Sequence, residues 1–336
     1  MEQKHLLMLT RSLAFRSMKI LFTADWHIKL GQKNVPMPWA CSRYDLFFDV
    51  LHEIELDVDM HIIGGDLFDR VPSMDELTLY FDYIKHIKIP TIIYDGNHEA
   101  TKKNKTFFSN LKRATTDVNP KVTIIDETTE YEWGTILPYA DLHKKGGIEA
   151  CNSTKPLYTH VRGAIPPHVT PEVDLDRFND FPVVFAGDLH SHTNTQRNIV
   201  YPGSPMTTSF HRDIVKTGYI IIDTELMYGD YSWHEFDLPQ LIRKTVEDSA
   251  DMIQTEYHHT IYEIEGDVAD LATIKNSELL DKKVVRRTSE ATLNLKDLSM
   301  EEELVEYLSA ILNLTDDKIK SIMGVFNDYS KNATLG

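Results

Sequence analysis

Side chains able to bind a metal follow five short apolar runs in this sequence of 336 residues. Each run has the length and the composition of a buried strand. In open α/β sheets the ligand crevice lies at the carboxyl ends of the strands, so we expect these side chains to converge on one place. They are Asp25 and His27 after run 19–24, Asp66 after 60–65, Asn97 and His98 after 90–94, His160 after 155–159, and His190 and His192 after 182–186.

The chemistry of this set is that of a centre for divalent cations. Carboxylates, an amide and imidazoles without a thiolate suit Mn²⁺, Fe²⁺ or Mg²⁺ better than a structural zinc ion, which favours cysteine. One shared carboxylate can hold two ions about 3.5 to 4 Å apart, the spacing used for in-line displacement at phosphorus. Taken alone, His27 or His160 is more often an ordinary core or loop histidine, and Asp25 or Asp66 is more often a helix cap. The conjunction of all of them favours the metal centre.

The pattern of the elements predicts α/β architecture with buried sheets. Apolar runs alternate with amphipathic helices expected at 44–55 and 73–87, and a further strand is expected at 218–223. Near residue 238 the pattern changes to a small α+β unit, with strands at 259–264, 283–287 and 291–295 and a helix at 270–281. Two amphipathic helices follow, and the first begins with a capping-box sequence at Ser299.

Composition restricts the class of protein. With 42% apolar and 26% charged residues the chain reads as soluble and globular, long enough for two domains. No run approaches the ~20 apolar residues of a membrane span, so no membrane is expected among its partners. Cys41 and Cys151 cannot form a disulfide framework or a thiolate metal site, which favours a reducing, cytoplasmic setting.

Five ordered motifs resemble those of the calcineurin-like metallophosphoesterases. They are Asp25-Trp26-His27, Gly65-Asp66-Leu67-Phe68-Asp69, Gly96-Asn97-His98-Glu99, the lone His160, and His190-Ser191-His192. The segment Tyr201-Pro202-Gly203-Ser204-Pro205 narrows the match, because it resembles an element of the SbcD-type nuclease subunit, the bacterial and viral counterpart of the double-strand-break repair nuclease. The resemblance covers about residues 18 to 225.

The resemblance implies a site with two metal ions, most simply Mn²⁺, with Mg²⁺ or Fe²⁺ as alternatives. It assigns to the first ion Asp25, His27, Asp66 and His192. It assigns to the second ion Asp66, Asn97, His160 and His190, so that Asp66 bridges. His98 matches the catalytic histidine, and the carboxylate that orients it is left open among Asp69, Asp95 and Glu99.

Three positions depart from the family pattern. Leu189 stands where a glycine usually precedes the first histidine of the last motif, and Asp188 puts the geometry of that loop in doubt. Glu99 replaces the more usual aspartate of the third motif, and Gly31 is displaced from its usual place after the first motif. None of these changes removes a proposed ligand.

The resemblance also implies an architecture and a domain order. The fold would be a four-layer α/β-β/α sandwich with a small C-terminal α+β accessory, or capping, domain and terminal helices. The expected boundaries are an N-terminal extension at 1–17, a nuclease domain at 18–238, an accessory domain at 239–298, and a helix pair at 299–336 that docks on the partner.

The function that the resemblance implies is metal-dependent hydrolysis of DNA phosphodiester bonds, as an exonuclease and endonuclease acting in recombination, repair or replication. The partners would be DNA, an SbcC-type coiled-coil ATPase and a second copy of the chain, paired through 73–87 and 106–113. Two alternatives stay open. One is a phosphomonoesterase or cyclic-nucleotide phosphodiesterase on the same fold, and the other is a scaffold that does not catalyse.

The net charge of −17 argues against a general nucleic-acid binder, because phosphate contacts need Lys and Arg. Two clusters of basic residues stand out against this acidic background, although a run of charged residues more often forms a surface that contacts only solvent. They are Lys102, Lys103, Lys105, Lys112 and Arg113 after the third motif, and Lys282, Lys283, Arg286 and Arg287 in the accessory unit. We expect them to touch backbone phosphates.

Overall fold

The computed structural model describes residues 17–102, 105–224, 230–285, 298–312 and 314–333. The chain divides into two compact units, each of which is described by itself. The first comprises residues 1–264 and 274–283, and the second comprises 265–273 and 284–336. Most of the expected accessory domain therefore groups with the first unit, and the expected strand at 291–295 lies outside the described residues.

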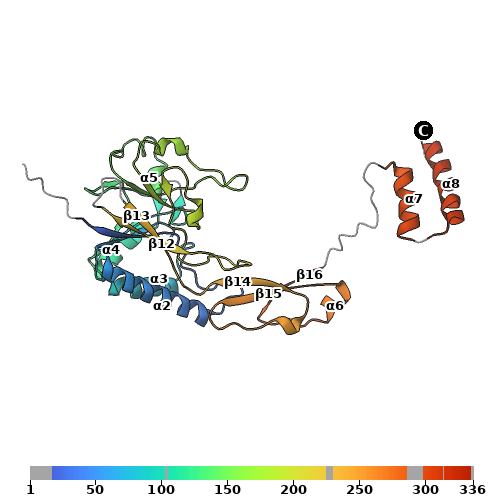
Figure 1. Cartoon of the computed structure of the whole chain (residues 1–336), viewed down its shortest axis with the longest axis horizontal. Coiled ribbons are helices and arrows are strands. Elements are labelled where there is room, and N and C mark those ends of the chain that lie inside the picture. Colours follow the sequence, from blue (N-terminus) through green and yellow to red (C-terminus); the bar gives the residue numbers. More distant parts are fainter. Residues whose placement is uncertain (1–16, 103–104, 225–229, 286–297, 313, 334–336) are drawn as a thin grey trace, which may run out of the picture. The chain divides into compact units, whose positions relative to one another are not determined.

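The first unit is built on a six-stranded sheet in the order β13-β12-β1-β2-β3-β6. Two of its strands, β12 and β13, are labelled in Figure 1. Its strands are β1 Lys19–Thr23, β2 Met60–Gly64, β3 Thr91–Tyr94, β6 Val122–Ile125, β12 Gly218–Asp223 and β13 Asp230–Glu235. The strands β1, β2, β3 and β6 run parallel, whereas β12 is antiparallel to β1. The carboxyl ends of β1, β2 and β3 therefore meet at one edge, as expected from the sequence.

A second sheet has the order β11-β10-β9-β8-β7. Its strands are β7 Thr129–Glu130, β8 Thr135–Leu137, β9 Leu157–His160, β10 Val184–Gly187 and β11 Ile199–Val200. The strands β8, β9 and β10 are parallel, so β9 and β10 also deliver their carboxyl ends to one edge.

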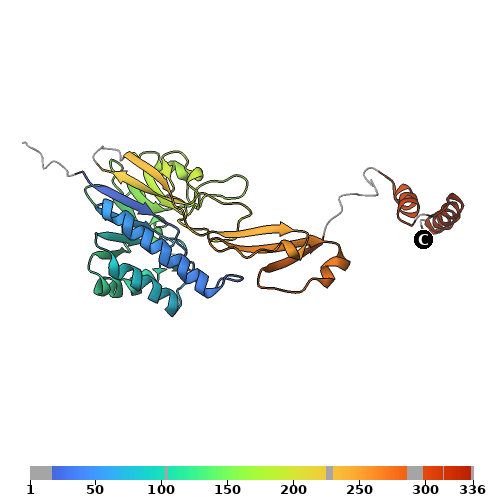
Figure 2. The same cartoon turned by 60° about the horizontal axis from the view of Figure 1, so that its bottom comes forward.

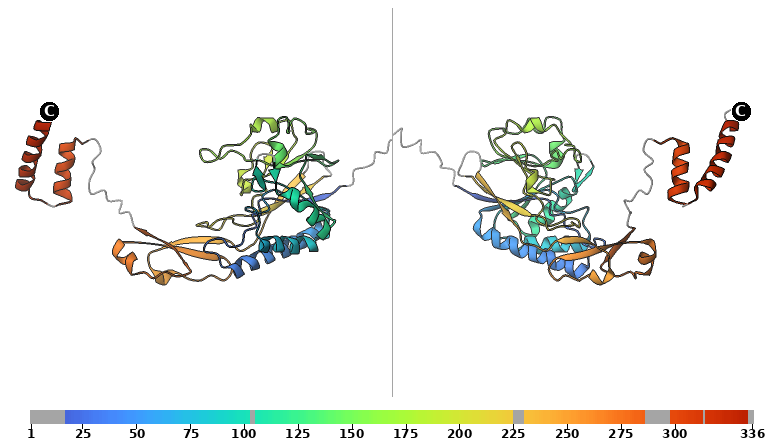
Figure 3. Two further views of the ribbon diagram at one scale, coloured as in Figure 1. Left: turned by 180° about the vertical axis from the view of Figure 1, so that it is seen from behind. Right: turned by 45° about the vertical axis from the view of Figure 1, so that its right-hand side comes forward.

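An apolar layer joins the inner faces of the two sheets. Phe22 of β1 contacts Tyr158 of β9 and Phe185 of β10, with ring centroids 5.9 and 6.0 Å apart. On the outer face of the first sheet lie α2 Met37–Ile54, α3 Met74–His86 and α4 Phe108–Val118, next to one another in both views of Figure 3. The outer face of the second sheet is covered by the short helix α5 Tyr139–Leu142 and by loops. The expected four-layer sandwich is confirmed, with a reduced fourth layer.

Local sequence explains where the helices begin. Ser73 caps α3, because its side chain accepts from the N–H of Glu76 while the Glu76 carboxylate accepts from the N–H of Ser73. Helix α2 begins seven residues before the expected position, because the proline at its start suits a first turn that needs no N–H donors.

The described residues beyond β13 hold a small sheet and three helices (Figure 2). The sheet has the order β14-β15-β16, with β14 Leu241–Val246, β15 His259–Gly266 and β16 Leu280–Val285. The expected helix at 270–281 is wrong for the residues after Thr273, because the helix observed here, α6, spans only Val268–Thr273. Beyond it, the Leu279 carbonyl accepts from the N–H of Tyr262 in β15. The two terminal helices are α7 Met300–Ala310 and α8 Asp316–Ala333, and they contact each other.

A buried polar network ties the helical layer to the first sheet. The Glu55 carboxylate, 3% exposed, accepts from Tyr83 of α3 at 2.8 Å and contacts the ring nitrogens of His61 at 2.9 Å and His52 at 3.0 Å. On its other side, His61 contacts the Thr23 hydroxyl at 2.9 Å. Burial alone raises the pKa of Glu55, but the hydrogen bonds from His52, His61 and Tyr83 outweigh it and hold the pKa at about 2.

We expect the change Glu55→Gln to lower the free energy of unfolding by about 2 kcal/mol at pH 7, because the amide cannot accept all these hydrogen bonds. The folded pKa lies below the value of ~4.3 in unfolded chains, so this stability is fully present above about pH 4.3 and is lost as the pH falls through about 2. Urea unfolding at pH 7 and pH 3 measures the difference. The exposed Glu53→Gln is the matched control, and an equal loss in both variants would contradict the expectation.

Candidate metal centre

The loops after β1 and β2 are joined to each other through their backbones. The N–H of Asp25 donates to the carbonyl of Gly65 at 3.1 Å, and the N–H of His27 donates to the carbonyl of Asp66 at 2.9 Å. Asp25, His27 and Asp66 all have left-handed backbones, with φ of 57°, 45° and 50°. Such strained conformations in residues other than glycine cluster at functional sites, where the surrounding structure holds them.

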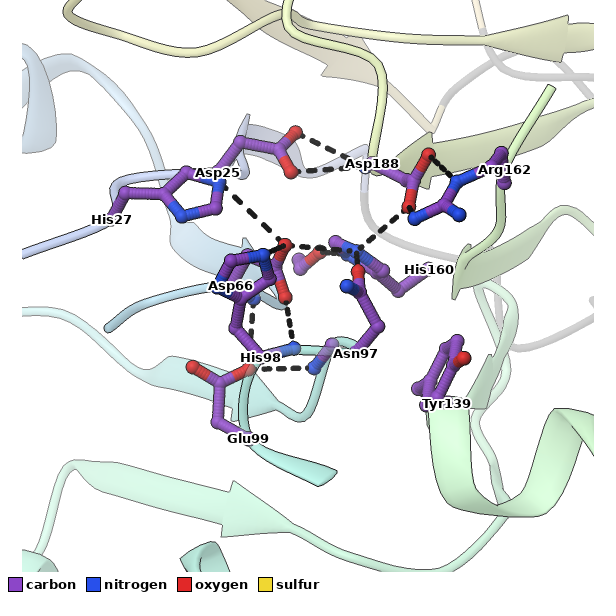
Figure 4. A network of polar contacts seen from close by, with 12 residues as sticks. Asp25, His27, Asp66, Asn97, His98, Glu99, Tyr139, His160, Arg162 and Asp188 are labelled. Carbon is purple, nitrogen blue, oxygen red and sulfur yellow. Dashed lines mark hydrogen bonds and ion pairs between the residues drawn. The ribbon is translucent and has the colours of Figure 1, made fainter. Parts of the chain in front are cut away.

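The Asp66 carboxylate faces two groups of nitrogen atoms (Figure 4). Its Oδ1 accepts from the backbone N–H of His98 at 2.9 Å. Its Oδ2 lies 3.6 Å from His27 Nε2 and 3.4 Å from His160 Nε2. Burial raises the pKa of Asp66, but the nearby imidazoles, His160 first, outweigh it and lower the pKa. One ionised oxygen atom is thus shared between two sets of potential metal ligands.

The first set contains Asp25, His27 and His190, whose ligand atoms all lie within 4.8 Å of one another. His27 Nε2 and His190 Nε2 are 3.1 Å apart. Burial lowers the pKa of His27 to about 3, so its ring is neutral, as metal binding requires. Thr208 contacts the other ring nitrogen of His190 at 3.3 Å, which leaves Nε2 of His190 for the centre.

The second set contains Asp25, Asp66 and His160, with Asn97 beside them. The Nδ1 atom of His160 donates to the Gly64 carbonyl at 2.9 Å, which directs Nε2 into the centre. Gly65 and Gly187 make room for this ring, because a Cβ atom on either would lie 2.5 Å from Nδ1 of His160.

The loop after β10 differs from the sequence-based expectation. Strand β10 ends at Gly187, so Asp188, and not only His190, projects into the centre. His192 lies elsewhere: its Nδ1 donates to the Tyr201 carbonyl at 2.7 Å and its ring stacks on Trp233. His190 lies beside His27 rather than with the Asn97 set. The predicted assignments of His190 to the second ion and of His192 to the first therefore do not fit this geometry.

His98 lies at the mouth of the centre, with its side chain 36% exposed. Its Nδ1 donates to the backbone carbonyl of Asp69 at 2.5 Å, and its Nε2 is 3.9 Å from Asp66 Oδ2. A backbone carbonyl, rather than one of the three candidate carboxylates, thus orients this ring. The Asp69 carboxylate pairs instead with Lys29 at 2.7 Å.

Glu99 is fully buried and joins the second loop to the third. Its carboxylate accepts from the N–H groups of Asp66 at 2.9 Å, Phe68 at 3.0 Å and Gly96 at 2.8 Å. Burial and the charge of Asp66 raise the pKa of Glu99 to about 8, although the backbone N–H groups lower it. Glu99 therefore positions the loop that carries Asp66 and does not contact the centre through its own oxygens.

Sequence reasoning thus placed most of the centre and missed two neighbours. Seven predicted residues converge: Asp25, His27, Asp66, Asn97, His98, His160 and His190. Asp188 and Arg162 were missed as members of the centre. Their positions in the sequence could have indicated them, since Arg162 lies two residues beyond the end of β9 and Asp188 lies one residue beyond the end of β10. Within the described residues, no helix has the length and hydrophobicity that a membrane crossing requires.

Comparison with known proteins gives the family. Residues 18–192 match the calcineurin-like phosphoesterase domain. The chain belongs to this family. It is 40% identical over 329 residues to the probable exonuclease subunit 1 of Escherichia phage T5, covering 94% of this chain and 99% of that protein. It is 26% identical over 258 residues to the D subunit of the SbcCD nuclease of Staphylococcus saprophyticus, covering 61% and 65%. It is 24% identical over 239 residues to the putative phosphoesterase 244L of Invertebrate iridescent virus 6, covering 63% and 79%.

The side chains present fit the divalent metal ions that a calcineurin-like phosphoesterase implies. Asp25 and Asp66 are 0% and 2% exposed, and burial, with the charges of Asp66 and Asp188, raises the pKa of Asp25 well above its usual range. Carboxylates buried this close together repel one another unless positive charge lies between them. Neutral imidazole nitrogens and an amide complete a donor set for such ions.

We expect Glu99→Gln to lower the free energy of unfolding by about 2 to 3 kcal/mol, because the amide nitrogen must face at least one backbone N–H donor. Its Mn²⁺ affinity should also fall, since the loop that carries Asp66 loses its anchor. Urea unfolding and Mn²⁺ titration calorimetry measure the two effects. The exposed Glu132→Gln serves as control, and a Glu99→Gln variant that matches it in both measurements would contradict the role of Glu99.

Proposed function

We propose that this phosphoesterase is a metal-dependent DNA exonuclease and endonuclease, which hydrolyses phosphodiester bonds at a centre of two metal ions. The observation that carries the proposal is the position of Asp66 Oδ2 between the His27 and His160 nitrogens, as a bridging ligand requires. The names of the phage T5 and Staphylococcus relatives, an exonuclease subunit and a nuclease subunit, favour DNA over a small phosphate ester.

The ligands of the two ions, in this proposal, are the converging residues. Asp25, His27 and His190 would hold one ion, Asn97 and His160 the other, and Asp66 both. Carboxylate, amide and imidazole ligands make Mn²⁺ the first choice. When bound, the ions supply the Lewis acidity that activates water and neutralises charge on the non-bridging phosphate oxygens.

His98 is the proposed general acid. Donation of its Nδ1–H to the Asp69 carbonyl fixes the ring, so that Nε2 points toward the centre and carries the proton that can be transferred. The backbone N–H of His98 also donates to Asp66 Oδ1, which couples the position of the acid to that of the bridging carboxylate. His98 thereby protonates the leaving 3′-oxygen as the phosphodiester bond breaks.

We expect His98→Asn to lower Mn²⁺-dependent cleavage of linear duplex DNA by at least about 100-fold, the range of a general acid, while Mn²⁺ binding persists. The exposed His168→Asn is the matched control and should cleave as the wild type does. Cleavage at the wild-type rate by His98→Asn with metals bound would refute the role. A chromogenic phosphate monoester assayed beside DNA separates the nuclease from a phosphomonoesterase, and a chelator should abolish cleavage.

The ATPase partner and the second copy of the chain are further parts of the proposal, with a role in recombination, repair or replication. In the second unit, Leu308 of α7 and Ile319 of α8 are buried, whereas Val305, Ile322 and Val325 are 38%, 39% and 71% exposed. A helix pair with this much exposed apolar surface is suited to docking on a coiled coil. Helices α3 and α4 are the candidates for pairing two copies of the nuclease.

Truncation before Ser299 should abolish co-purification with the coiled-coil ATPase, while Mn²⁺-dependent cleavage by the isolated chain persists, because all proposed ligands precede it. The milder Val325→Asp should weaken the interaction by placing a charge on the exposed apolar surface. Co-expression and pull-down with the full-length chain as reference make the measurement. A truncated chain that still captures the ATPase would rule out this docking site.

Contacts with DNA phosphates are proposed only for part of the basic clusters. Lys112 pairs with Asp126 at 2.6 Å and Lys282 pairs with Glu263 at 2.9 Å, so both are partly neutralised. Arg113 also lies 3.6 Å from the Asp117 carboxylate, but its side chain is 93% exposed, where an ion pair is weak, so it is the better candidate for a phosphate. The side chains of Lys102, Lys103, Lys105, Arg286 and Arg287 lie outside the described residues.

A further inference from the structure

The Asn97 amide marks the place of a cation. One end of the amide lies 3.2 Å from Asp66 Oδ2, 3.1 Å from His160 Nε2 and 3.2 Å from Asp188 Oδ1. With the amide oxygen at this point, four lone-pair atoms face one another. With the NH₂ group there, two hydrogens would have to serve three acceptors. Ligands about 2.1 Å from an octahedral ion lie about 3 Å from one another, so these separations are those expected around a bound ion.

We propose that Asp188, and not His190, is the last ligand of this ion, that His192 is a ligand of neither ion, and that Arg162 is the residue that positions Asp188. The proposal rests on the two-metal centre described above. Asp188 Oδ1 is 4.0 Å from His160 Nε2, and both side chains are almost fully buried, at 5% and 0% exposure. With Asp66, Asn97 and His160, the carboxylate gives the second ion four ligands from the protein.

The backbone of Asp188 is held as firmly as that of the other ligands. Asp188 has a φ of 101° and is the fourth residue of the centre with a positive φ, beside Asp25, His27 and Asp66. Its N–H donates to the Asp25 carboxylate, with distances of 3.0 and 3.2 Å to the two oxygens. This contact ties the loop after β10 to the first metal ligand of the chain.

Arg162 compensates the charge that a carboxylate adds. An aspartate in place of a neutral imidazole brings one more negative charge into a buried centre that already holds Asp25 and Asp66. The Arg162 guanidinium meets the Asp188 carboxylate through two nitrogens, Nε at 3.2 Å and NH2 at 3.1 Å, on the side away from His160 (Figure 4). This two-point contact fixes the plane of the carboxylate so that Oδ1 also faces Asn97.

A second row of contacts holds Arg162 in place. Its NH1 lies 3.3 Å from the Glu172 carboxylate, which also accepts from the Tyr139 hydroxyl at 2.7 Å and lies 3.1 Å from His143 Nε2. Arg162 is therefore anchored between two carboxylates, only one of which faces the metal centre. Such outer contacts orient metal ligands and tune their affinity.

The ring of His192 makes its contacts outside the metal centre. Its Nδ1 is engaged by the Tyr201 carbonyl, and the ring stacks on Trp233 with an interplanar angle of 12° and a centroid distance of 5.2 Å. Trp233 in turn donates to the Pro202 carbonyl at 2.9 Å. These contacts fasten the Tyr201-Pro202-Gly203-Ser204-Pro205 segment to β13, so we assign His192 a structural role.

A Mn²⁺ titration by calorimetry on the full chain tests the proposal, with Asp188→Asn and His192→Gln as a matched pair from one loop. We expect the wild type to bind two Mn²⁺ ions, Asp188→Asn to lose one or to bind it at least about 100-fold more weakly, and His192→Gln to keep both. Electron paramagnetic resonance should show the coupling between two Mn²⁺ ions in the wild type and in His192→Gln, and not in Asp188→Asn. Thermal melts confirm that each variant is folded.

The outcomes separate this proposal from the proposed function. Loss of one ion in His192→Gln, or retention of two tightly bound ions in Asp188→Asn, overturns the assignment of Asp188. Absence of Mn²⁺ binding in the wild-type chain instead overturns the two-metal centre itself.

The role of Arg162 has its own readout. We expect Arg162→Gln to weaken only the second Mn²⁺, by about 10- to 100-fold, and Arg162→Lys to recover part of that loss by restoring the charge. The double change Arg162→Gln with Asp188→His should bind two ions again, because a neutral imidazole needs no compensating cation, and its preference should move from Mn²⁺ toward Zn²⁺. Equal weakening of both ions in Arg162→Gln, or no recovery in the double variant, would contradict the role of Arg162.

Discussion

The structure depends on one unfavourable arrangement, the gathering of lone-pair atoms around Asp66 Oδ2. Ring nitrogens of His27 and His160 and one end of the Asn97 amide all lie within 3.6 Å of this oxygen. The fold brings them there by laying parallel strands side by side, so that loops from both sheets end at the same place. Left-handed backbones at Asp25, His27 and Asp66 have a conformational cost that a divalent cation, attracted to the same atoms, can offset.

The residue types after the strands were predictable because they follow from two local rules. An apolar run buried in a parallel sheet ends where the first polar side chain appears, and the carboxyl edge of the sheet collects those side chains. The loop after β10 offers two candidate pairs of ligands. One pair is Asp188 and His190, the other is His190 and His192, and the choice between them was not predictable in this way. Both pairs have the same spacing of two residues, and only the end of β10 at Gly187 decides which pair enters the centre.

Long-range contacts account for what the sequence could not give. The partner of Asp188 is Arg162, which lies 26 positions earlier, two residues beyond the end of the neighbouring strand β9, and no periodicity links the two. In the accessory region, the helix expected beyond Thr273 is replaced by chain that pairs with β15, so sheet formation overrides local helix propensity. The orientation of His98 by a backbone carbonyl is likewise invisible to a search for carboxylates, because every residue has a carbonyl.

The net charge of −17 acquires a different meaning once the centre is known. Asp25, Asp66 and Asp188 contribute three of the negative charges from buried positions, where Arg162 and the divalent cations of the proposed centre would outweigh them. A phosphate group would then meet a positive potential at the centre, whereas the acidic exposed surface elsewhere repels it. Such a distribution disfavours nonspecific binding along the duplex, since that binding scales with the number of phosphates neutralised. DNA would then be held strongly only where its phosphate reaches the metals and His98, and additional affinity would have to come from a partner.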